Sequence, residues 1–252
     1  MLEFREIKVQ YGAKLILDRI SFQVQPCRMT VLVGRNGCGK STLLAALNQQ
    51  IPYSGKMLVE DADCAEMDAR ARARKIAILP QTIPAPHITV EEVVRFGRNP
   101  HLDFLGRIKN DDEVFTAQAM HDADVTALRD RFADTLSGGE RQRVYLAMVL
   151  AQNTPVICLD EPTAHMDQMH EAEFLELLTR MKKRGKSILV VVHDLSLATH
   201  YADDLVVIDQ TKLVFAGDKQ CCLRERVLEK TFGVRRYTVT DHGMERYFFS
   251  AY

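Results

Sequence analysis

The nine residues GRNGCGKST at positions 34–42 constrain the fold of this chain more than any other stretch. They follow the run TVLV at 30–33, which is typical of a buried strand, and they precede a helical pattern at 43–47. A strand that ends in glycines and turns into a helix leaves several backbone N–H groups pointing at one spot, and the helix dipole adds partial positive charge there. The stretch therefore predicts a phosphate-binding loop in an α/β protein.

The side chains of this loop suit a nucleotide. Lys40 would reach the β- and γ-phosphates as a point charge, the Ser41 hydroxyl would ligate Mg²⁺, and Thr42 would lie over the α- and β-phosphates. The alternative is a chance glycine turn ahead of a core helix. Because the lysine and both hydroxyls stand at the required places after a buried strand, we favour the nucleotide site.

Cysteine usage indicates reduced thiols. The chain has 6 cysteines with no C-x-x-C spacing, which argues against disulfides and against a zinc site. Cys38 differs because it lies inside the phosphate loop. A helix N-terminus lowers the pKa of a thiol, which would favour a thiolate at Cys38 and gives the hypothesis that alkylation of Cys38 blocks nucleotide binding and that ATP protects it. We favour the alternative, that Cys38 is a small filler residue.

The composition is that of an ordinary globular protein, with 252 residues, 46% hydrophobic content and a formal net charge of -1. Such a charge gives no electrostatic reason to expect nucleic acid or an anionic membrane as a bulk partner. No apolar run approaches the ~20 residues of a bilayer-spanning helix. The N-terminus is charged where a signal peptide is apolar. We therefore expect a cytoplasmic chain that binds no nucleic acid and does not itself cross the membrane.

A second junction between a loop and a helix follows later in the chain. The sequence LSGGE at 136–140 precedes a helical run at 141–151, so a serine and two glycines again stand at a helix N-terminus. By the same physics this junction predicts another anion site.

Two carboxylates end the apolar run at 156–159. Asp160 can hold the Mg²⁺ shell, and Glu161 can orient or deprotonate the water that attacks the γ-phosphate in line. Two acids at the tip of a buried strand are costly without such a role. The pair therefore predicts the hydrolytic part of the site.

Two further polar residues follow predicted strands, at the edge where open α/β sheets bind ligands. Gln81 comes after the strand at 76–79, and His193 comes after the strand at 187–192. His193 could touch the γ-phosphate. The alternatives are a surface glutamine and a structural histidine whose hydrogen bonds are satisfied.

Three other features leave two interpretations each. Tyr11, an aromatic residue in a turn, either packs or stacks on an adenine ring. The segment FGRNPHLDFLGR at 96–107 is either a partner surface or a loop folded back on the protein. The cluster HMDQMH at 165–170 suggests a metal site, but it lies where a loop becomes the helix at 171–181, so His165 and His170 can lie on different faces.

The remaining pattern predicts a series of short elements. Near the N-terminus we expect strands at 2–9 and 20–25, joined through 11–12 and 15–18, then a strand at 55–60 and a basic helix or turn at 68–74 whose arginines form a solvated face. A mainly helical insertion follows at 88–151, with Thr89 as an N-cap. The C-terminal part should contain strands at 205–209 and 213–216, a last helix at 223–232, and a hairpin at 237–249 that turns at 241–243 and whose aromatic residues pack in the core and the hairpin.

Taken in this order, the motifs resemble those of the ATP-binding subunit of ABC transporters, over almost the whole chain. The phosphate loop, Q-loop, signature, acidic strand, D-loop and switch histidine of that family correspond to residues 34–42, Gln81, residues 136–140, Asp160 with Glu161, Asp167 and His193. The resemblance implies an α/β fold with a P-loop NTPase core at 1–87 and 152–252, an N-terminal antiparallel β subdomain, and an α-helical subdomain inserted at 88–151. The D-loop wording, AHMD, departs from the family's commoner forms but retains Asp167.

The resemblance also implies roles for these residues, with ATP and Mg²⁺ as cofactors. Gln81 joins Ser41 and Asp160 around Mg²⁺. Glu161 is the catalytic base, and His193 supports the γ-phosphate together with Lys40. The residues expected to bind ATP are Tyr11, Gly34, Asn36, Gly37, Cys38, Gly39, Lys40, Ser41, Thr42, Ser137, Gly138, Gly139 and Asp167.

Partners are implied in the same way. Two copies pair head to tail, so that Ser137, Gly138 and Gly139 of one copy close over ATP held by the other. The dimer drives an integral membrane permease at the cytoplasmic face of the inner membrane, with a periplasmic or extracellular substrate-binding protein in the full system. Residues 96–107 resemble a stretch of importers for ferric siderophores, ferric citrate, haem and cobalamin, which favours an iron chelate as cargo. The alternative is a soluble ABC ATPase of iron–sulfur cluster assembly.

Overall fold

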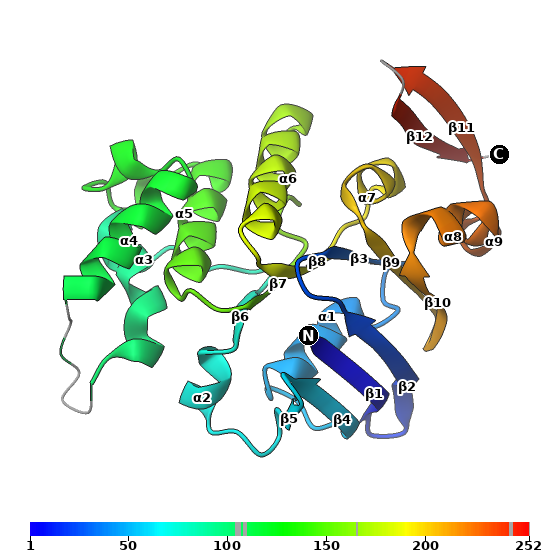
Figure 1. Ribbon diagram of the computed structural model, residues 1–252, viewed down its shortest axis with the longest axis horizontal. Coiled ribbons are helices and arrows are strands. Elements are labelled where there is room, and N and C mark those ends of the chain that lie inside the picture. The colour runs from blue at the N-terminus through cyan, green and yellow to red at the C-terminus, as the bar shows by residue number, and fades with distance from the viewer. Residues whose placement is uncertain (104–106, 108–109, 165, 242–243, 252) are drawn as a thin grey trace. The chain divides into compact units, whose positions relative to one another are not determined.

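The computed structural model describes residues 1–103, 107, 110–164, 166–241 and 244–251. The chain divides into two compact units, shown as a ribbon in Figure 1. The first unit consists of Met1–Glu66 with Ser187–Tyr252, and the second unit is Met67–Lys186. A different division is expected from the sequence, with a core at 1–87 and 152–252 and a helical subdomain at 88–151. That division is based on the subdomains of the family that the chain resembles, and it stays a prediction.

An antiparallel sheet opens the first unit. Its strands are β1 (Leu2–Tyr11), β2 (Lys14–Val24), β4 (Ser54–Val59) and β5 (Ala62–Asp63), in the order β2-β1-β4-β5. The expected connection at 15–18 is wrong, because Tyr11 pairs with Lys14 and leaves only a two-residue turn. Gly12 supplies the positive φ, 56°, that such a turn requires. Residues 15–18 therefore belong to β2.

A second sheet in this unit carries the phosphate loop. The strands of this sheet that belong to the first unit are β3 (Met29–Gly34), β8 (Ser187–Val191), β9 (Asp204–Asp209) and β10 (Lys212–Asp218). Both β8 and β9 run parallel to β3, and β10 is antiparallel to β9. All residues of β3 and β8 are buried, as expected for strands of a parallel sheet that is covered on both faces. Because β3 and β8 are parallel, their carboxyl ends lie at one edge.

The C-terminal part of the first unit differs from the sequence prediction. The expected single helix at 223–232 is two helices, α8 (Lys219–Arg224) and α9 (Val227–Phe232). Arg226 between them has a left-handed backbone with φ 55°, which no continuous helix accommodates. The predicted hairpin is confirmed as β11 (Val234–Asp241) and β12 (Met244–Ala251), whereas residues 242–243 of its turn lie outside the described residues.

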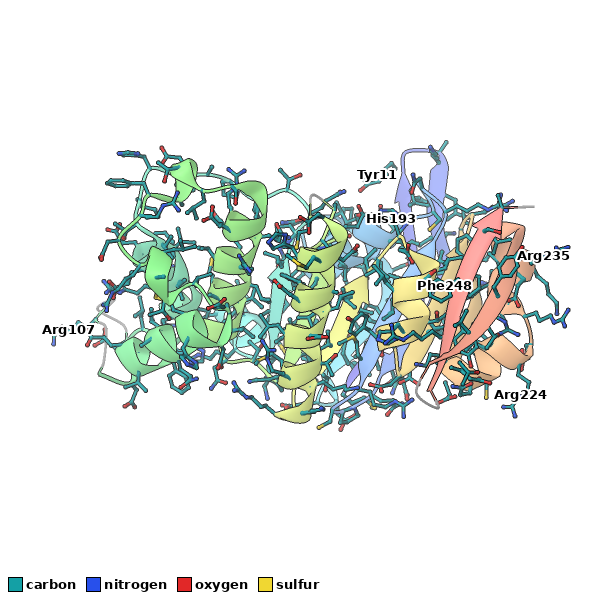
Figure 2. The ribbon with its side chains drawn as sticks, turned by 90° about the horizontal axis from the view of Figure 1, so that it is seen from above. Tyr11, Arg107, His193, Arg224, Arg235 and Phe248 are labelled. Atoms are coloured by element: carbon teal, nitrogen blue, oxygen red, sulfur yellow. The ribbon has the colours of Figure 1, made fainter. Side chains whose placement is uncertain are left out.

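The outer face of this hairpin is not packed as expected. Tyr237 and Phe248 form a cross-strand pair, and their side chains are 49% and 47% exposed. Arg235 lies two residues along β11 from Tyr237 and is also exposed; Figure 2 shows its side chain extending away from the strands. The opposite face is only partly buried, at Val234, Arg236, Tyr247 and Phe249, so no hairpin residue whose burial is described belongs to the core.

Helices dominate the second unit. Its elements are α2 (Ala69–Ala73), β6 (Ile76–Leu79), α3 (Val90–Arg95), the 3₁₀ helices η1 (Phe96–His101), η2 (Thr126–Leu128) and η3 (Ala133–Thr135), α4 (Asn110–Asp122), α5 (Gly138–Ala151), β7 (Val156–Asp160) and α6 (Gln168–Lys183). Thr89 is confirmed as the N-cap of α3, where it forms a capping box with Glu92. Strands β6 and β7 are parallel.

The described part of the segment at 96–107 folds back on the protein. Gly97 approaches α5 so closely that a Cβ there would lie 2.1 Å from Met148 O. Arg98 is buried, and its guanidinium donates to Asp112 Oδ1 at 2.9 Å and to Ala151 O at 2.6 Å. Residues 97 and 98 are thus structural, and residues 104–106 lie outside the described residues.

Arg70 in α2 and Arg74 at its C-cap are exposed, as expected for a solvated face, and both also contact the protein. Arg70 Nε and Arg74 Nε both donate to Pro100 O, at 2.9 and 2.7 Å. The carbonyl oxygen of a short 3₁₀ helix thereby holds α2 in place. Sequence periodicity could not reveal this contact because it joins residues about thirty positions apart.

Candidate nucleotide-binding site

The phosphate loop is shaped by its glycines. Gly37 and Gly39 have positive φ, 78° and 101°, and Gly39 is the residue preceding α1 (Lys40–Leu47). A Cβ at Gly34 would lie 2.3 Å from Ile208 O, and a Cβ at Gly39 would lie 2.6 Å from Leu17 Cδ2. Gly37 faces open space, with nothing within 4 Å of a built Cβ. Only glycine fits the close approaches, and the open side is where a phosphate can enter.

Lys40 lies inside this loop. Its side chain is almost fully buried, and Nζ donates to Gly34 O at 2.9 Å and to Arg35 O at 3.4 Å. The ammonium therefore holds the two ends of the loop together. It also places a positive charge within the phosphate loop.

The hypothesis of a reactive thiolate at Cys38 is wrong. The thiol is buried, at 3% exposure, and burial raises its pKa despite the nearby positive charge of Lys40. A helix N-terminus lowers a thiol pKa only when the thiolate is not desolvated at the same time. Cys38 is the small filler residue of the alternative interpretation.

Arg35 ties the loop to the C-terminal part of the unit. Its Nη2 donates to Thr231 O in α9 at 2.7 Å, and its Nε lies 3.7 Å from Asp209 Oδ1 at the end of β9. No sequence pattern predicts these contacts, because the two partners follow Arg35 by more than 170 positions. The contact fixes the outer side of the phosphate loop.

Tyr11 and His193 belong to the same unit as the loop, and both side chains are labelled in Figure 2. Tyr11 ends β1, and its side chain is 51% exposed, which fits stacking better than core packing. His193 follows β8 by two residues and is exposed. Since Val191 pairs with Leu32, two residues before Gly34, His193 lies at the same sheet edge as the phosphate loop.

In the second unit, Gln81 and Glu161 are in direct contact. Each follows the end of one of two parallel strands, whose residues Leu79 and Leu159 pair with one another. Gln81 Nε2 donates to Glu161 Oε2 at 2.6 Å. The structure therefore brings together two residues that the sequence placed at strand ends 80 positions apart.

The backbone at Glu161 is unusual, with φ 48°. Residues other than glycine rarely adopt a positive φ, and a glutamate keeps this conformation only where the surrounding structure stabilises it. The preceding residue, Asp160, is 5% exposed at the end of β7. The tip of this strand thus presents two carboxylates from a rigid, strained turn.

Candidate metal ligands in the chain are oxygen donors. The candidates in the second unit are the Gln81 side-chain carbonyl and the Asp160 carboxylate, and the candidate in the first unit is the Ser41 hydroxyl; each is a hard oxygen donor of the kind that Mg²⁺ prefers. The metal site considered at 165–170 has no support: in the part of the chain that the structure describes, no three His, Cys, Asp or Glu side chains form a metal-binding group. His165 itself lies outside the described residues.

Asp167 instead caps a helix. Its Oδ1 accepts from the backbone N–H of His170 at 2.9 Å and lies 2.8 Å from His170 Nδ1, which makes it the N-cap of α6. The hydrogen bond from the His170 backbone lowers the pKa of Asp167, with the His170 ring contributing next. The carboxylate is thus ionised and held against its own helix.

The second loop-to-helix junction has the expected form. Ser137 is the N-cap of α5 and forms a capping box with Glu140, whose Oε2 accepts from Ser137 N at 2.8 Å. Hydrogen bonds from Ser137 lower the pKa of Glu140. Ser137 and Gly138 are exposed, and Gly139 faces open space. The junction therefore presents backbone N–H groups outward at the start of a 14-residue helix.

The phosphate loop followed by a helix, and a parallel strand tipped with two carboxylates, define a P-loop nucleotide hydrolase. A family model described as ABC transporter matches residues 17–164. The chain therefore belongs to the ABC transporter family, as an ATP-binding subunit that hydrolyses ATP.

Relatives of known name cover nearly the whole chain. It is 38% identical over 240 residues to the achromobactin transport ATP-binding protein CbrD of Dickeya dadantii, covering 94% of this chain and 89% of that protein. It is 34% identical over 243 residues to the ferric enterobactin transport ATP-binding protein FepC of Escherichia coli, covering 95% and 90%. It is 41% identical over 229 residues to the hemin import ATP-binding protein HmuV of Rhodococcus jostii, covering 90% and 78%.

Solved structures agree in fold. A chain of an ABC transporter in an inward-facing conformation superposes with a TM-score of 0.85 at 23% identity, covering 99% of this chain and 96% of that one. The ATP-binding cassette MJ1267 in its ADP conformation gives 0.81 at 22% identity, covering 92% and 98%. The predicted fold class is confirmed, and the soluble iron–sulfur alternative is not favoured by the relatives.

Proposed function

We propose that this chain powers the uptake of an iron chelate, such as a ferric siderophore, ferric citrate or haem, through a separate membrane permease. The observation that carries the proposal is its similarity, over 90% or more of its length, to relatives named for achromobactin transport, ferric enterobactin transport and hemin import. Within the part that the structure describes, no helix is long and apolar enough to cross a bilayer. In the proposal, a separate permease chain provides the path through the membrane, and this chain acts at the cytoplasmic face.

ATP hydrolysis follows from the chain's own residues. The buried ammonium of Lys40 offsets the charge of the β- and γ-phosphates, and Tyr11 offers its exposed ring to the adenine. Ser41, Asp160 and Gln81 are the residues that would hold Mg²⁺, and the ion would supply positive charge to offset that of the phosphates.

The attacking water needs a partner that can orient it and accept its proton. Glu161 takes this role as general base, since its carboxylate follows a buried strand and is fixed by the amide of Gln81. His193, at the edge of the phosphate loop, would contact the γ-phosphate. No other residue of the chain needs to move a proton in this scheme.

A head-to-tail dimer completes the site. The exposed junction at Ser137 and Gly138 presents backbone N–H groups with no phosphate-binding lysine beside them in the sequence, so it suits the ATP held by another copy. Binding of ATP then closes the dimer and hydrolysis opens it, which gives a permease a two-state drive.

The permease contact belongs to the second unit. Among its described residues, Phe96, Val114, Phe115 and Phe132 are 52%, 67%, 37% and 41% exposed and are available for a partner. Together with the Gln81 region they offer a surface for the permease. A substrate-binding protein outside the membrane would deliver the chelate.

The test uses the Glu161→Gln variant, which should bind ATP without hydrolysing it and accumulate as a closed dimer. The tagged variant is purified from detergent-solubilised membranes with ATP, and co-purifying proteins are identified; Glu176→Gln, on the exposed side of α6, is the matched control. Recovery of a polytopic permease with Glu161→Gln supports the proposal. Recovery only from the soluble fraction, or with cluster-assembly proteins, overturns it.

A further inference from the structure

The loop between β7 and α6 is held by side chains of α6 itself. Within the described residues of this loop, 161–164 and 166–167, two backbone hydrogen bonds are present, from Ala164 N to Glu161 O at 3.2 Å and from Met166 N to Thr163 O at 3.0 Å. Both have ordinary lengths, but single turn bonds of this kind contribute little stability by themselves. Something else must fix the loop that carries Glu161 at one end and Asp167 at the other.

The first turn of α6 provides two such contacts. Thr163 Oγ1 donates to Glu171 Oε1 at 2.5 Å, and Thr163 is nearly buried, at 6% exposure. The His170 ring and backbone both hold Asp167 Oδ1, at 2.8 and 2.9 Å. His170 and Glu171, which are adjacent in α6, therefore contact the loop at Asp167 and Thr163, two residues four positions apart.

The helix is a firm anchor for this grip. It is 16 residues long, and its Phe174 and Leu178 are 1% and 0% exposed in the core of the second unit. By contrast, Glu161 has a left-handed backbone that its own preferences oppose. A strained catalytic turn keeps its geometry only if rigid neighbours define it.

We propose that Glu171 and His170 are positioning residues for ATP hydrolysis: Glu171 acts through Thr163 on the backbone that presents Glu161, and His170 acts through Asp167 on the loop that reaches the partner's nucleotide. The Glu171 half rests on ATP hydrolysis, and the His170 half rests on the proposed dimer. Since the Asp167 carboxylate is already held by its own helix, Asp167 contributes by fixing the loop.

Simple helix capping does not account for both contacts. Asp68, Asp194 and Asp218 cap α2, α7 (Leu195–Tyr201) and α8 by accepting a backbone N–H, as Asp167 does. The bond from Thr163 to Glu171 is of another kind, because it joins side chains 8 positions apart across a loop. This bond pairs no backbone group at the end of a helix, so what it constrains is the conformation of the loop.

The test of the Glu171 contact compares purified full-length variants by steady-state ATP hydrolysis. Glu171→Ala and Thr163→Val should each lower kcat roughly tenfold to a hundredfold, with the KM for ATP within about twofold, because the loop orients Glu161 and does not bind the phosphates. Glu171→Gln retains an acceptor oxygen and should keep kcat within about twofold. The double variant should be no slower than the slower single variant, since both remove one bond. Glu176→Ala, on the exposed side of the same helix, is the control and should behave like the parent chain.

Three outcomes would overturn this half: an additive double variant, a Glu176→Ala loss equal to that of Glu171→Ala, or a higher KM with unchanged kcat. If Glu171→Ala does not fold, Thr163→Ser and Thr163→Val decide the matter. Serine keeps the hydroxyl and should retain kcat, whereas valine should lose it. Equal rates for these two variants count against the proposal.

The His170 contact is tested in the Glu161→Gln background. The side-chain nitrogen of asparagine can replace Nδ1, so His170→Asn should retain the dimer that forms with ATP, while His170→Ala should reduce its fraction in size-exclusion chromatography. His121→Ala, on the exposed surface of α4, is the control. Equal dimer fractions for His170→Ala and His121→Ala overturn this half. Failure of the permease capture leaves both tests intact, because they use the purified chain alone.

Discussion

The amide of Gln81 and the carboxylate of Glu161 share a hydrogen bond of 2.6 Å within the second unit. Since Glu161 is the general base of the proposed mechanism, Gln81 holds the group that must face the attacking water. The same amide has a carbonyl oxygen left to ligate a cation. One side chain thus links the two halves of the hydrolytic site.

Replacing this amide by an acid should stop hydrolysis. Gln81→Glu places two carboxylates at hydrogen-bond distance, and their repulsion should turn Glu161 away and lower kcat by roughly tenfold or more. Phosphate release at saturating ATP measures the effect. Gln118→Glu is a matched control, because Gln118 Nε2 likewise donates to a carboxylate, Asp122 Oδ1, at 2.9 Å on α4. Equal losses in the two variants would show that Gln81 has no special role.

The glycines of the phosphate loop should differ in their tolerance of a methyl group. Both Gly37→Ala and Gly39→Ala adopt a positive φ that costs about 1–2 kcal/mol. Only Gly39→Ala also meets a neighbour, Leu17 Cδ2 at 2.6 Å, so it should lose more stability and more ATP affinity than Gly37→Ala. Urea unfolding and equilibrium binding of a fluorescent ATP analogue measure these two quantities. The reverse order would contradict the loop geometry described above.

The thiol of Cys38 should react slowly. Burial raises its pKa, so the thiolate forms only above the pH at which an ordinary cysteine ionises. Iodoacetamide should therefore label Cys38 in the folded chain more slowly than exposed Cys27 at pH 8, and the rate should still be rising well above that pH. Peptide mass spectrometry over time separates the two sites. Faster labelling of Cys38 than of Cys27 would restore the reactive thiolate.

Removal of Arg98 should destabilise the second unit strongly. Its side chain and that of Asp112 are 5% and 3% exposed, so Arg98→Met leaves a buried carboxylate without its cation and should cost about 3–5 kcal/mol. Arg184→Met, which breaks the pair with Asp122 at a half-exposed arginine, should cost less than about 1 kcal/mol. Urea unfolding gives both values. Adding Asp112→Leu should recover much of the first loss, and no recovery would contradict the stated cause.

Local patterns predicted much of the site. The loop at 34–42, the capping residues Thr89 and Ser137, and the polar ends of the parallel strands all depend on neighbours within a few positions, where spacing carries the physics. Parallel strands then bring Gln81 and Glu161 together, because their carboxyl ends share an edge. The order of the motifs along the sequence was sufficient to identify the family.

Contacts between distant side chains were not predictable in this way. Arg35 with Thr231, Arg98 with Asp112, and Thr163 with Glu171 depend on where the backbone brings each pair. The direction of the pKa shift at Cys38 was mispredicted for the same reason, since burial is a property of the packed chain. The break at Arg226 was missed because a single residue with positive φ leaves no mark on apolar periodicity.

The hydrogen bond from Arg35 to Thr231 has a practical consequence for anyone who shortens or tags this protein. Residues beyond 226 look dispensable in a linear map, since every recognised motif precedes them. Yet Thr231 O in α9 accepts a hydrogen bond from Arg35 of the phosphate loop, so a truncation upstream of α9 removes a contact of that loop. A C-terminal fusion partner should therefore follow the intact hairpin of β11 and β12, so that the hairpin separates the fusion partner from α9.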